Sequence, residues 1–295
     1  MLINEILRTK EGFSPLEVTL ADYLLEHSQA IKKQSARYIA KKLFTAPSTI
    51  VRLCQKIGYQ GYNEFREAYL QEQVYLSKHF DRIDPNNPFD FQDKNMVIAN
   101  KMGSLYHEVI EDVLTLLDHD QLQATIHLLG EADFIYIFSL GVQLDIAQTF
   151  KDKMLKIGKN VITEEKADEM FYRSKYCDQK SVFVLISYSG ETETLLRIAK
   201  QLKKRHIPLL AITTYGENSL FQYADFILYV SSREKLIDNL GSFSMNLSVL
   251  FLLDILYANL FNEDRENHYQ KRVDASKSFE QYRTTHNSLL KDGNE

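Results

Sequence analysis

Hydrophobic positions near the start of the chain repeat at the three- and four-residue spacing of helices. The stretch Ser14-Pro15-Leu16-Glu17 predicts a helix start, because a capping hydroxyl, a proline at the first helical position and a carboxylate three residues after the cap occur together. Leu20, Tyr23 and Leu24 continue the face that Leu16 begins. A second helix is predicted after Ser35, with three apolar side chains turned inward: Ala36, Ile39 and Leu43.

A tight break follows this second helix. Thr45-Ala46-Pro47 ends it and opens a third helix, which is predicted to run to about Ile57 and to be terminated by Gly58 in a left-handed conformation. The apolar residues of the third helix fall on one side: Ile50, Leu53, Cys54 and Ile57. Cys54 is therefore predicted to be a core residue and not a reactive thiol. Two short helices separated by such a break are typical of a helix-turn-helix module.

Positive charge is concentrated in this part of the chain, although the whole protein has a formal net charge of -5. Residues 1–78 hold 11 Lys and Arg against 8 Asp and Glu, a net +3, and the segment 30–66 holds eight cations against Glu64 alone, a net +7. Such a surface fits a polyanion, and a solvated basic face is the alternative. The third helix carries hydrogen-bond donors opposite its apolar row, so we expect this side in the major groove of DNA. The candidate DNA-binding residues are Arg37, Lys41, Ser48, Thr49, Arg52, Gln55 and Lys56.

Helical periodicity continues beyond this module. A helix is predicted over 63–77, and the stretch Asp84-Pro85-Asn86-Asn87-Pro88 marks a break through its prolines and turn-forming residues. We place a linker at 79–93. An amphipathic helix then follows from Lys94 to about Leu117, and it either covers the next domain or pairs with a second subunit.

Beyond Gly130 the pattern changes to short apolar runs that alternate with helical segments. Strands are predicted at 134–138, 160–163, 181–186, 208–213 and 226–230, and helices at 142–156, 191–204 and 245–261. This alternation predicts a mostly parallel sheet covered by helices on both faces. The fold class is therefore an all-α helix-turn-helix domain (1–78) joined by the linker to an α/β domain (94–262), with a C-terminal tail (263–295).

The composition is that of an ordinary globular protein, with 44% hydrophobic and 12% aromatic residues. The segment 245–261 is slightly short for a membrane span, and three polar residues interrupt it, so a buried core helix is predicted. These residues are Asn246, Asp254 and Asn259.

Two further features bear on the compartment. Cys54 and Cys177 have no partner motif around them, which gives no sign of a disulfide framework or a thiol-rich metal site. The start Met1-Leu2-Ile3-Asn4-Glu5 lacks the basic and apolar blocks of a secretion signal. We therefore expect a cytoplasmic protein that has no membrane partner.

A hydroxyl-rich turn follows the strongest predicted strand. Ser187, Ser189, Gly190 and Thr192 lie between the strand 181–186 and the next helix, where free helix amides favour an anion. Hydroxyls and a glycine in this context predict a phosphate site, and the alternative is that the hydroxyls only cap the helix. The first strand ends in a similar stretch that supplies a second lip to the pocket, with Ser139, Gly141 and Gln143 as its candidate residues.

Several stretches in both halves of the chain carry a family resemblance. They are, in chain order, Ser48-Thr49-Ile50-Val51-Arg52-Leu53, Lys56-Ile57-Gly58-Tyr59-Gln60-Gly61-Tyr62, Ile186-Ser187-Tyr188-Ser189-Gly190-Glu191-Thr192, Ala211-Ile212-Thr213 and Ser219-Leu220 before Ala224-Asp225. Over residues 1–262 the chain resembles the RpiR family of bacterial regulators, which join an N-terminal helix-turn-helix to a sugar isomerase (SIS) domain.

The resemblance implies a regulator of carbohydrate-use genes that binds a double-stranded DNA operator and a phosphorylated sugar. Ser187, Ser189 and Thr192 match the hydroxyl positions that contact phosphate in the family. In the first loop the family usually has glycine and serine, whereas this chain has Ser139 and Gln143. Gly141 is kept. We expect a homodimer or homotetramer, in which two recognition helices match the symmetry of an operator, and we expect no cofactor.

Two other functions compete with this interpretation. SIS domains also occur in isomerases, whose chemistry needs a positioned base, and the last helix offers only Asp254. The 8 histidines lack metal-ligand spacing, so neither a catalytic residue nor a metal ligand is predicted. A pure protein-interaction module is the second alternative, and the net +7 of segment 30–66 argues against it.

Overall fold

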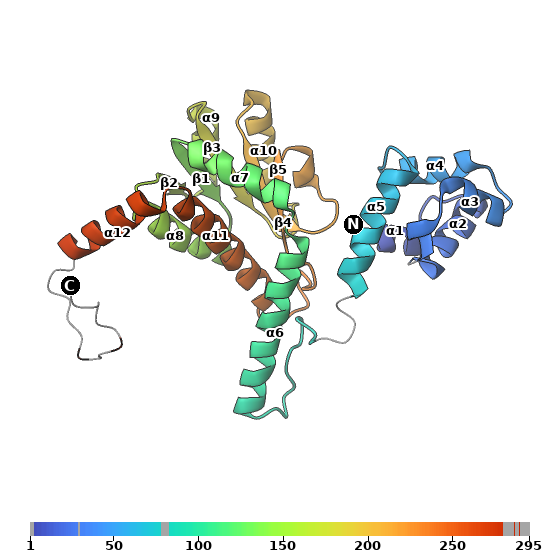
Figure 1. The fold of residues 1–295 in the computed structure, drawn as a ribbon, viewed down its shortest axis with the longest axis horizontal. Helices are drawn as coiled ribbons and strands as arrows, with labels where there is room; N and C mark the ends of the chain where they lie inside the picture. Colours follow the sequence, from blue (N-terminus) through green and yellow to red (C-terminus); the bar gives the residue numbers. More distant parts are fainter. Residues whose placement is uncertain (1–2, 29, 78–82, 280–285, 287–288, 290–295) are drawn as a thin grey trace.

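The computed structural model describes residues 3–28, 30–77, 83–279, 286 and 289. A helical unit comes first, and an α/β unit follows it along the chain (Figure 1). The helices of the first unit are α1 (Ile3–Thr9), α2 (Pro15–Glu26), the 3-10 turn η1 (Ala30–Lys33), α3 (Ala36–Lys42), α4 (Pro47–Lys56) and α5 (Tyr62–Ser77). The three helices expected at the start of the chain are confirmed as α2, α3 and α4.

Local signals set the ends of these helices. The Ser14 hydroxyl accepts the Glu17 amide while the Glu17 carboxylate accepts the Ser14 amide, so the predicted capping box is formed. Ser35 caps α3, and Pro47 is the first residue of α4. Gly58 follows the end of α4 with a φ of +99°, a conformation that glycine adopts without the steric penalty of a Cβ.

The core of the helical unit forms around one face of α4. Ile50, Leu53 and Cys54 of α4 are almost completely buried, and they belong to one hydrophobic cluster with Phe65 and Tyr69 of α5. Burial in this apolar environment raises the pKa of the Cys54 thiol to about 12, because the thiolate would lose its hydration. The prediction that Cys54 is a core residue is confirmed.

The segment after the helical unit is attached to the α/β unit. Part of the predicted linker, residues 79–82, lies outside the described residues, while 83–93 forms turns and α6 (Asn95–Leu116) follows. Arg233 donates to the Ile83 carbonyl at 2.7 Å and pairs with Glu108 of α6 at 3.0 Å. The described end of this segment is therefore fixed to the domain that follows it.

The α/β unit is built on a parallel sheet of five strands in the order β2-β1-β3-β4-β5. The strands are β1 (Phe134–Phe138), β2 (Val161–Thr163), β3 (Ser181–Ile186), β4 (Leu209–Thr214) and β5 (Phe226–Val230). Each lies within one residue of its predicted position. The predicted fold class, a helical domain followed by a parallel α/β domain, is confirmed.

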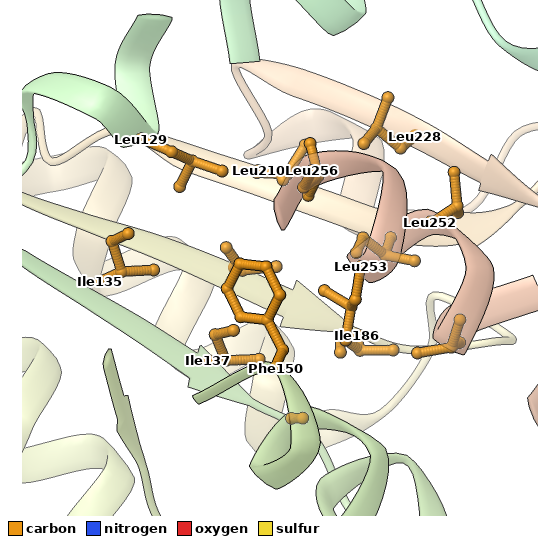
Figure 2. Packing of buried hydrophobic residues seen from close by; sticks show 14 of the residues in the cluster. Leu129, Ile135, Ile137, Phe150, Ile186, Leu210, Leu228, Leu252, Leu253 and Leu256 are labelled. Carbon is orange, nitrogen blue, oxygen red and sulfur yellow. The ribbon is translucent and has the colours of Figure 1, made fainter. Parts of the chain in front are cut away.

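Helices cover both faces of the sheet. One face packs on α6, α7 (His119–Glu131), α8 (Val142–Leu155) and α11 (Phe243–Glu263), and the other face packs on α9 (Ala167–Tyr176), α10 (Glu193–Arg205) and η2 (Ser219–Gln222). On the first face Leu252, Leu253 and Leu256 of α11 meet strand residues such as Ile186 and Leu210 (Figure 2). The last helix, α12 (Arg265–Phe279), lies in the segment that we expected to be a tail.

Helix α11 is long and apolar enough to cross a membrane on length and composition. Its apolar side chains nevertheless contribute to the core, because Val249, Leu252, Leu256 and Leu260 are at most 2% exposed. The prediction of a core helix at this position is confirmed in that respect.

Candidate functional site

The order of the strands creates a switch point between β1 and β3. These strands are neighbours, yet the helix that follows β1 (α8) and the helix that follows β3 (α10) pack on opposite faces of the sheet. The chain therefore diverges at the carboxyl ends of the two strands and leaves helix N-termini around the point of divergence. Ligands of open parallel sheets bind at such points.

The predicted hydroxyl-rich turn lies at the end of β3. The hydroxyls of Ser187 and Thr192 share a hydrogen bond of 2.9 Å, and the Ser187 carbonyl accepts the amide of Gly190 at 3.1 Å. The Ser189 hydroxyl accepts the Glu191 amide at 3.1 Å. The Ser187 and Thr192 hydroxyls thus satisfy each other, and the Ser189 hydroxyl is bonded to the backbone of the same turn. Thr192 is the N-cap of α10 but makes no side-chain cap bond, which weakens the alternative that this hydroxyl only caps the helix.

The Asn218 side chain fills the space beside Gly190 in this turn. Gly190 has a φ of +68°, and a Cβ added to it would come within 2.1 Å of the Asn218 side chain, so no other residue fits without moving Asn218. The Asn218 amide donates to the Thr213 hydroxyl at 3.1 Å, and the Glu191 carboxylate accepts the Ser219 amide at 2.7 Å. The turn and the segment after β4 are therefore bonded together. Sequence analysis noted the pair Ser219-Leu220 but did not identify Asn218.

The second predicted lip lies at the end of β1. Ser139 is buried and donates to the Ile186 carbonyl at 3.0 Å, so its hydroxyl joins the ends of β1 and β3. Gly141 is the N-cap of α8 with a φ of +67°. The Gln143 amide donates to the Asn246 side chain at 3.1 Å, which connects α8 to α11. The structure brings both lips to the same edge of the sheet, and contact of either with a ligand stays a prediction.

A buried glutamate beside this edge was missed by sequence analysis. Glu234 is 5% exposed, and its carboxylate accepts the Met245 amide at the start of α11 at 3.0 Å. Its other oxygen, Oε1, has no hydrogen-bond partner in the described part of the chain. Burial raises the pKa of Glu234, and the amides at the start of α11 oppose that rise. The Tyr188 hydroxyl, from the hydroxyl-rich turn, donates to the Glu234 carbonyl at 2.6 Å.

The signal for Glu234 was its place shortly before an apolar helix. Sequence analysis searched only inside that helix, where it found Asp254, and Asp254 instead forms an ion pair with Lys153. The expectation that Asp254 is the one candidate base is therefore wrong, because Glu234 contacts the hydroxyl-rich turn through Tyr188. A buried carboxyl group with a raised pKa is a candidate for proton transfer.

A separate hollow of about 500 Å³ lies between α9 and α10. Phe171, Tyr172, Arg197 and Lys200 are among the residues that line it, and none of the predicted effector residues is. Its lining runs along both helices, from Thr194 to Lys204 on α10, and no residue of the 187–192 turn contributes to it.

The predicted DNA-binding residues lie on the surface of the helical unit. Ser48, Arg52 and Gln55 of α4 are exposed on the side opposite its buried face. Arg37 and Lys41 of α3 are also exposed. In the described residues no ion pair involves Arg37, Lys41 or Arg52, so their charges remain available to a polyanion.

Three of the predicted residues are engaged within the unit, and one of them is Gln55, whose amide donates to the Gln60 carbonyl at 3.5 Å. Thr49 is half-buried and bonds the Thr45 hydroxyl at 3.2 Å. The Lys56 ammonium pairs with the buried carboxylate of Glu17 at 2.9 Å and lies 5.5 Å from the centre of the Phe13 ring. Lys56 therefore fixes α4 to the start of α2, and its contact with DNA stays a prediction.

Comparison with known sequences identifies both units. A family profile for the rpiR-family helix-turn-helix domain matches residues 1–74, and a profile for the SIS domain matches residues 128–259. A relative from Haemophilus influenzae, described as an uncharacterized HTH-type transcriptional regulator, is 26% identical over 268 residues. The match covers 90% of this chain and 91% of that relative.

Solved structures share the fold. The Vibrio vulnificus NanR protein, solved in complex with ManNAc-6P, has a TM-score of 0.59 and 23% identity, and the match covers 96% of this chain and 99% of that one. The sugar isomerase domain of an RpiR transcription factor from Sphaerobacter thermophilus has a TM-score of 0.54 and 12% identity, over 61% of this chain and 98% of that one. A candidate sugar-phosphate isomerase from Listeria monocytogenes has a TM-score of 0.55 and 17% identity, over 62% of this chain and 98% of that one.

Proposed function

Because this chain belongs to the RpiR family, with an rpiR-type helix-turn-helix domain followed by a SIS domain, we propose that it is a DNA-binding regulator of carbohydrate-metabolism genes. Its activity would be controlled by a phosphorylated sugar bound to the SIS domain. The observation that carries the DNA-binding part is the exposed row of donors on α4, backed by a buried apolar face. A helix anchored in this way can enter the major groove without losing its core contacts.

The effector part of the proposal rests on the turn at the switch point. Ser187, Ser189 and Thr192 present hydroxyls beside the N-terminus of α10, and Gly190 allows the backbone to approach a ligand closely. Gly141 and Gln143 would form the facing lip, with Ser139 as support beneath it. NanR, which was solved with ManNAc-6P, has the same fold and supports the choice of ligand class.

We further propose a cytoplasmic homodimer or homotetramer that acts without a cofactor or metal. Two recognition helices are needed to match a palindromic operator. Cys54 and Cys177 are both buried free thiols, which agrees with a reducing compartment.

The proposal is tested by screening sugar phosphates, including ManNAc-6P, for an increase in melting temperature and for an effect on binding to the protein's own promoter. A ligand that binds only the folded state raises the melting temperature. Ser189→Ala is expected to weaken effector binding about tenfold, because a hydrogen bond to a charged phosphate is lost, and to leave affinity for DNA unchanged. Ser278→Ala, on α12, is the control. A full response in the Ser189 variant would place the effector elsewhere.

Glu234 supports a second candidate function, a sugar-phosphate isomerase. Its buried carboxyl group has a raised pKa and a free oxygen, and it lies close to the hydroxyl-rich turn through Tyr188. Incubation with sugar phosphates in deuterated water would reveal proton exchange at the sugar by NMR. Turnover that disappears in Glu234→Gln would establish catalysis, and absence of turnover in the wild type would favour the regulator.

A further inference from the structure

The helical unit contacts the SIS domain beside the end of α4. The Glu217 carboxylate, in the segment between β4 and η2, lies so close to Gly58 that a Cβ added there would be 3.1 Å from its Oε1. Gly58 is the residue that terminates α4. The helical unit faces the SIS domain through α5 on this side of the molecule (Figure 1).

The neighbouring residues extend this contact. Tyr59, next to Gly58, is half-buried, and its pKa is raised by burial and then by the nearby charge of Glu217. Tyr215, two residues before Glu217, has a pKa raised to about 12 by burial and by Glu72 of α5. Charges of each unit therefore act on residues of the other, in agreement with the close approach of Glu217 to Gly58.

Residues 215–219, which include Glu217, are also bonded to the hydroxyl-rich turn. Asn218 directly follows Glu217, and its side chain fills the space beside Gly190. Ser219 donates its amide to Glu191, and Asn218 donates to Thr213. Residues 215–219 thus approach Gly58, just beyond the end of α4, through Glu217, and they contact the hydroxyl-rich turn through Asn218 and Ser219.

We propose that residues 215–219 link the two functions mechanically, so that a phosphate ester bound at the 187–192 turn loosens the docking of the helix-turn-helix unit on the SIS domain. This inference rests on the proposed effector site for the identity of its trigger. A phosphate beside the turn brings negative charge close to Glu191, which accepts from Ser219. Repulsion of Glu191 breaks that bond, and the phosphate displaces Asn218 from its place over Gly190. Glu217 then shifts away from Gly58.

Gly190→Ala reproduces this displacement without a ligand, because the new Cβ occupies the space of the Asn218 side chain. Gly158→Ala is the matched control: Gly158 also has a positive φ, of +81°, but an added Cβ meets only the Lys271 side chain, at 3.8 Å. Hydrogen–deuterium exchange of the full-length protein is measured by mass spectrometry. We expect amide exchange over residues 56–62 to increase at least about fivefold in Gly190→Ala, the lower end of typical coupling between sites, and to stay unchanged in Gly158→Ala.

Glu217→Ala removes the contact itself and serves as the second variant. It is expected to increase exchange over 56–62 and, since coupling is reciprocal, to change exchange over the 187–192 turn. Unchanged exchange over 56–62 in Glu217→Ala would overturn the proposal, and so would a Gly190→Ala variant in which exchange changes only over 215–219. If Gly190→Ala does not fold, amide exchange over residues 187–192 in Glu217→Ala is the test. A change there supports the proposal, and unchanged exchange contradicts it. Neither readout uses DNA or a sugar, so failure here is distinct from failure of the proposed function.

Discussion

Glu17 and Glu234 are both buried carboxyl groups, yet their surroundings shift their pKa values in opposite directions. The Ser14 amide and the Lys56 ammonium bond the Glu17 carboxylate and lower its pKa. Glu234 has only backbone amides at one oxygen, so the cost of burying its charge dominates and its pKa is raised. The first carboxylate stabilises its domain when ionised, whereas the second favours the protonated form.

Glu17→Ala is expected to lower the free energy of unfolding of the helix-turn-helix domain by about 2 kcal/mol, because it breaks the capping box and removes the ion pair with Lys56. The contribution of Glu17 is present above its unfolded pKa of 4.5 and is lost as the pH falls through its lowered folded value. Urea unfolding at neutral and acidic pH measures both effects. Asp22→Asn, in an exposed pair with Lys10, is the control and should change little. Equal stability of the Glu17 variant and the wild type would contradict this role.

The raised pKa of Glu234 predicts that the stability of the protein depends on pH in the opposite direction. Between 4.5 and its raised folded pKa, the folded state holds a proton that the unfolded state has released, so stability falls as the pH rises through this window. In Glu234→Gln this decline should be absent. Unfolding curves of the two proteins from pH 4.5 upward provide the measurement, and parallel curves would show that Glu234 ionises freely in the folded protein.

Elements with strong local signals were predictable from the sequence. Strand β3 is six consecutive residues, all buried, and Ser14 and Ser35 provide explicit helix starts. Helix α9 was missed because its N-cap, Lys166, makes no side-chain cap bond, and α12 because it is polar around most of its surface. Propensity alone gives such helices a weak signal, and tertiary packing decides them.

Some residues of the candidate site were predictable from the sequence and others were not. The 187–192 turn was predictable because strand, hydroxyls and helix are contiguous in the sequence. Glu234 and Asn218 were not, because each acquires its role through contacts with residues distant along the chain, Tyr188 and Gly190. The engagement of Lys56 with Glu17 was hidden for the same reason, since helical spacing places Lys56 on the outer side and says nothing of α2.

Helix α4 carries the sharpest test of DNA reading. Arg52→Ala is expected to cost about 1–3 kcal/mol in operator affinity if Arg52 reads a base, and to weaken all sequences equally if it contacts phosphate. Arg197→Ala removes the same charge from an exposed site on α10 and is the control. Fluorescence anisotropy with operator and scrambled DNA separates the outcomes. Unchanged binding to both would exclude α4 as the reading helix.

Charge is divided between the two ends of the chain. Residues 1–78 carry a net +3, whereas the whole protein carries -5, so the remainder is strongly acidic. A polyanion therefore attracts the helix-turn-helix unit and repels the SIS domain, which orients the protein at long range. If the proposed effector site is correct, the SIS domain binds a small anion locally while its overall charge repels DNA.

The dependence of DNA affinity on salt concentration tests most directly whether the basic surface of the helix-turn-helix unit binds DNA. Binding of the full-length protein to its promoter DNA is measured by anisotropy between about 50 and 200 mM salt, the range over which counterion release is resolved. The exposed cations of α3 and α4 predict a straight line of log affinity against log salt, with a slope of about -4 or steeper. A flat line, or no binding at the lowest salt, would contradict the assignment of this surface to DNA.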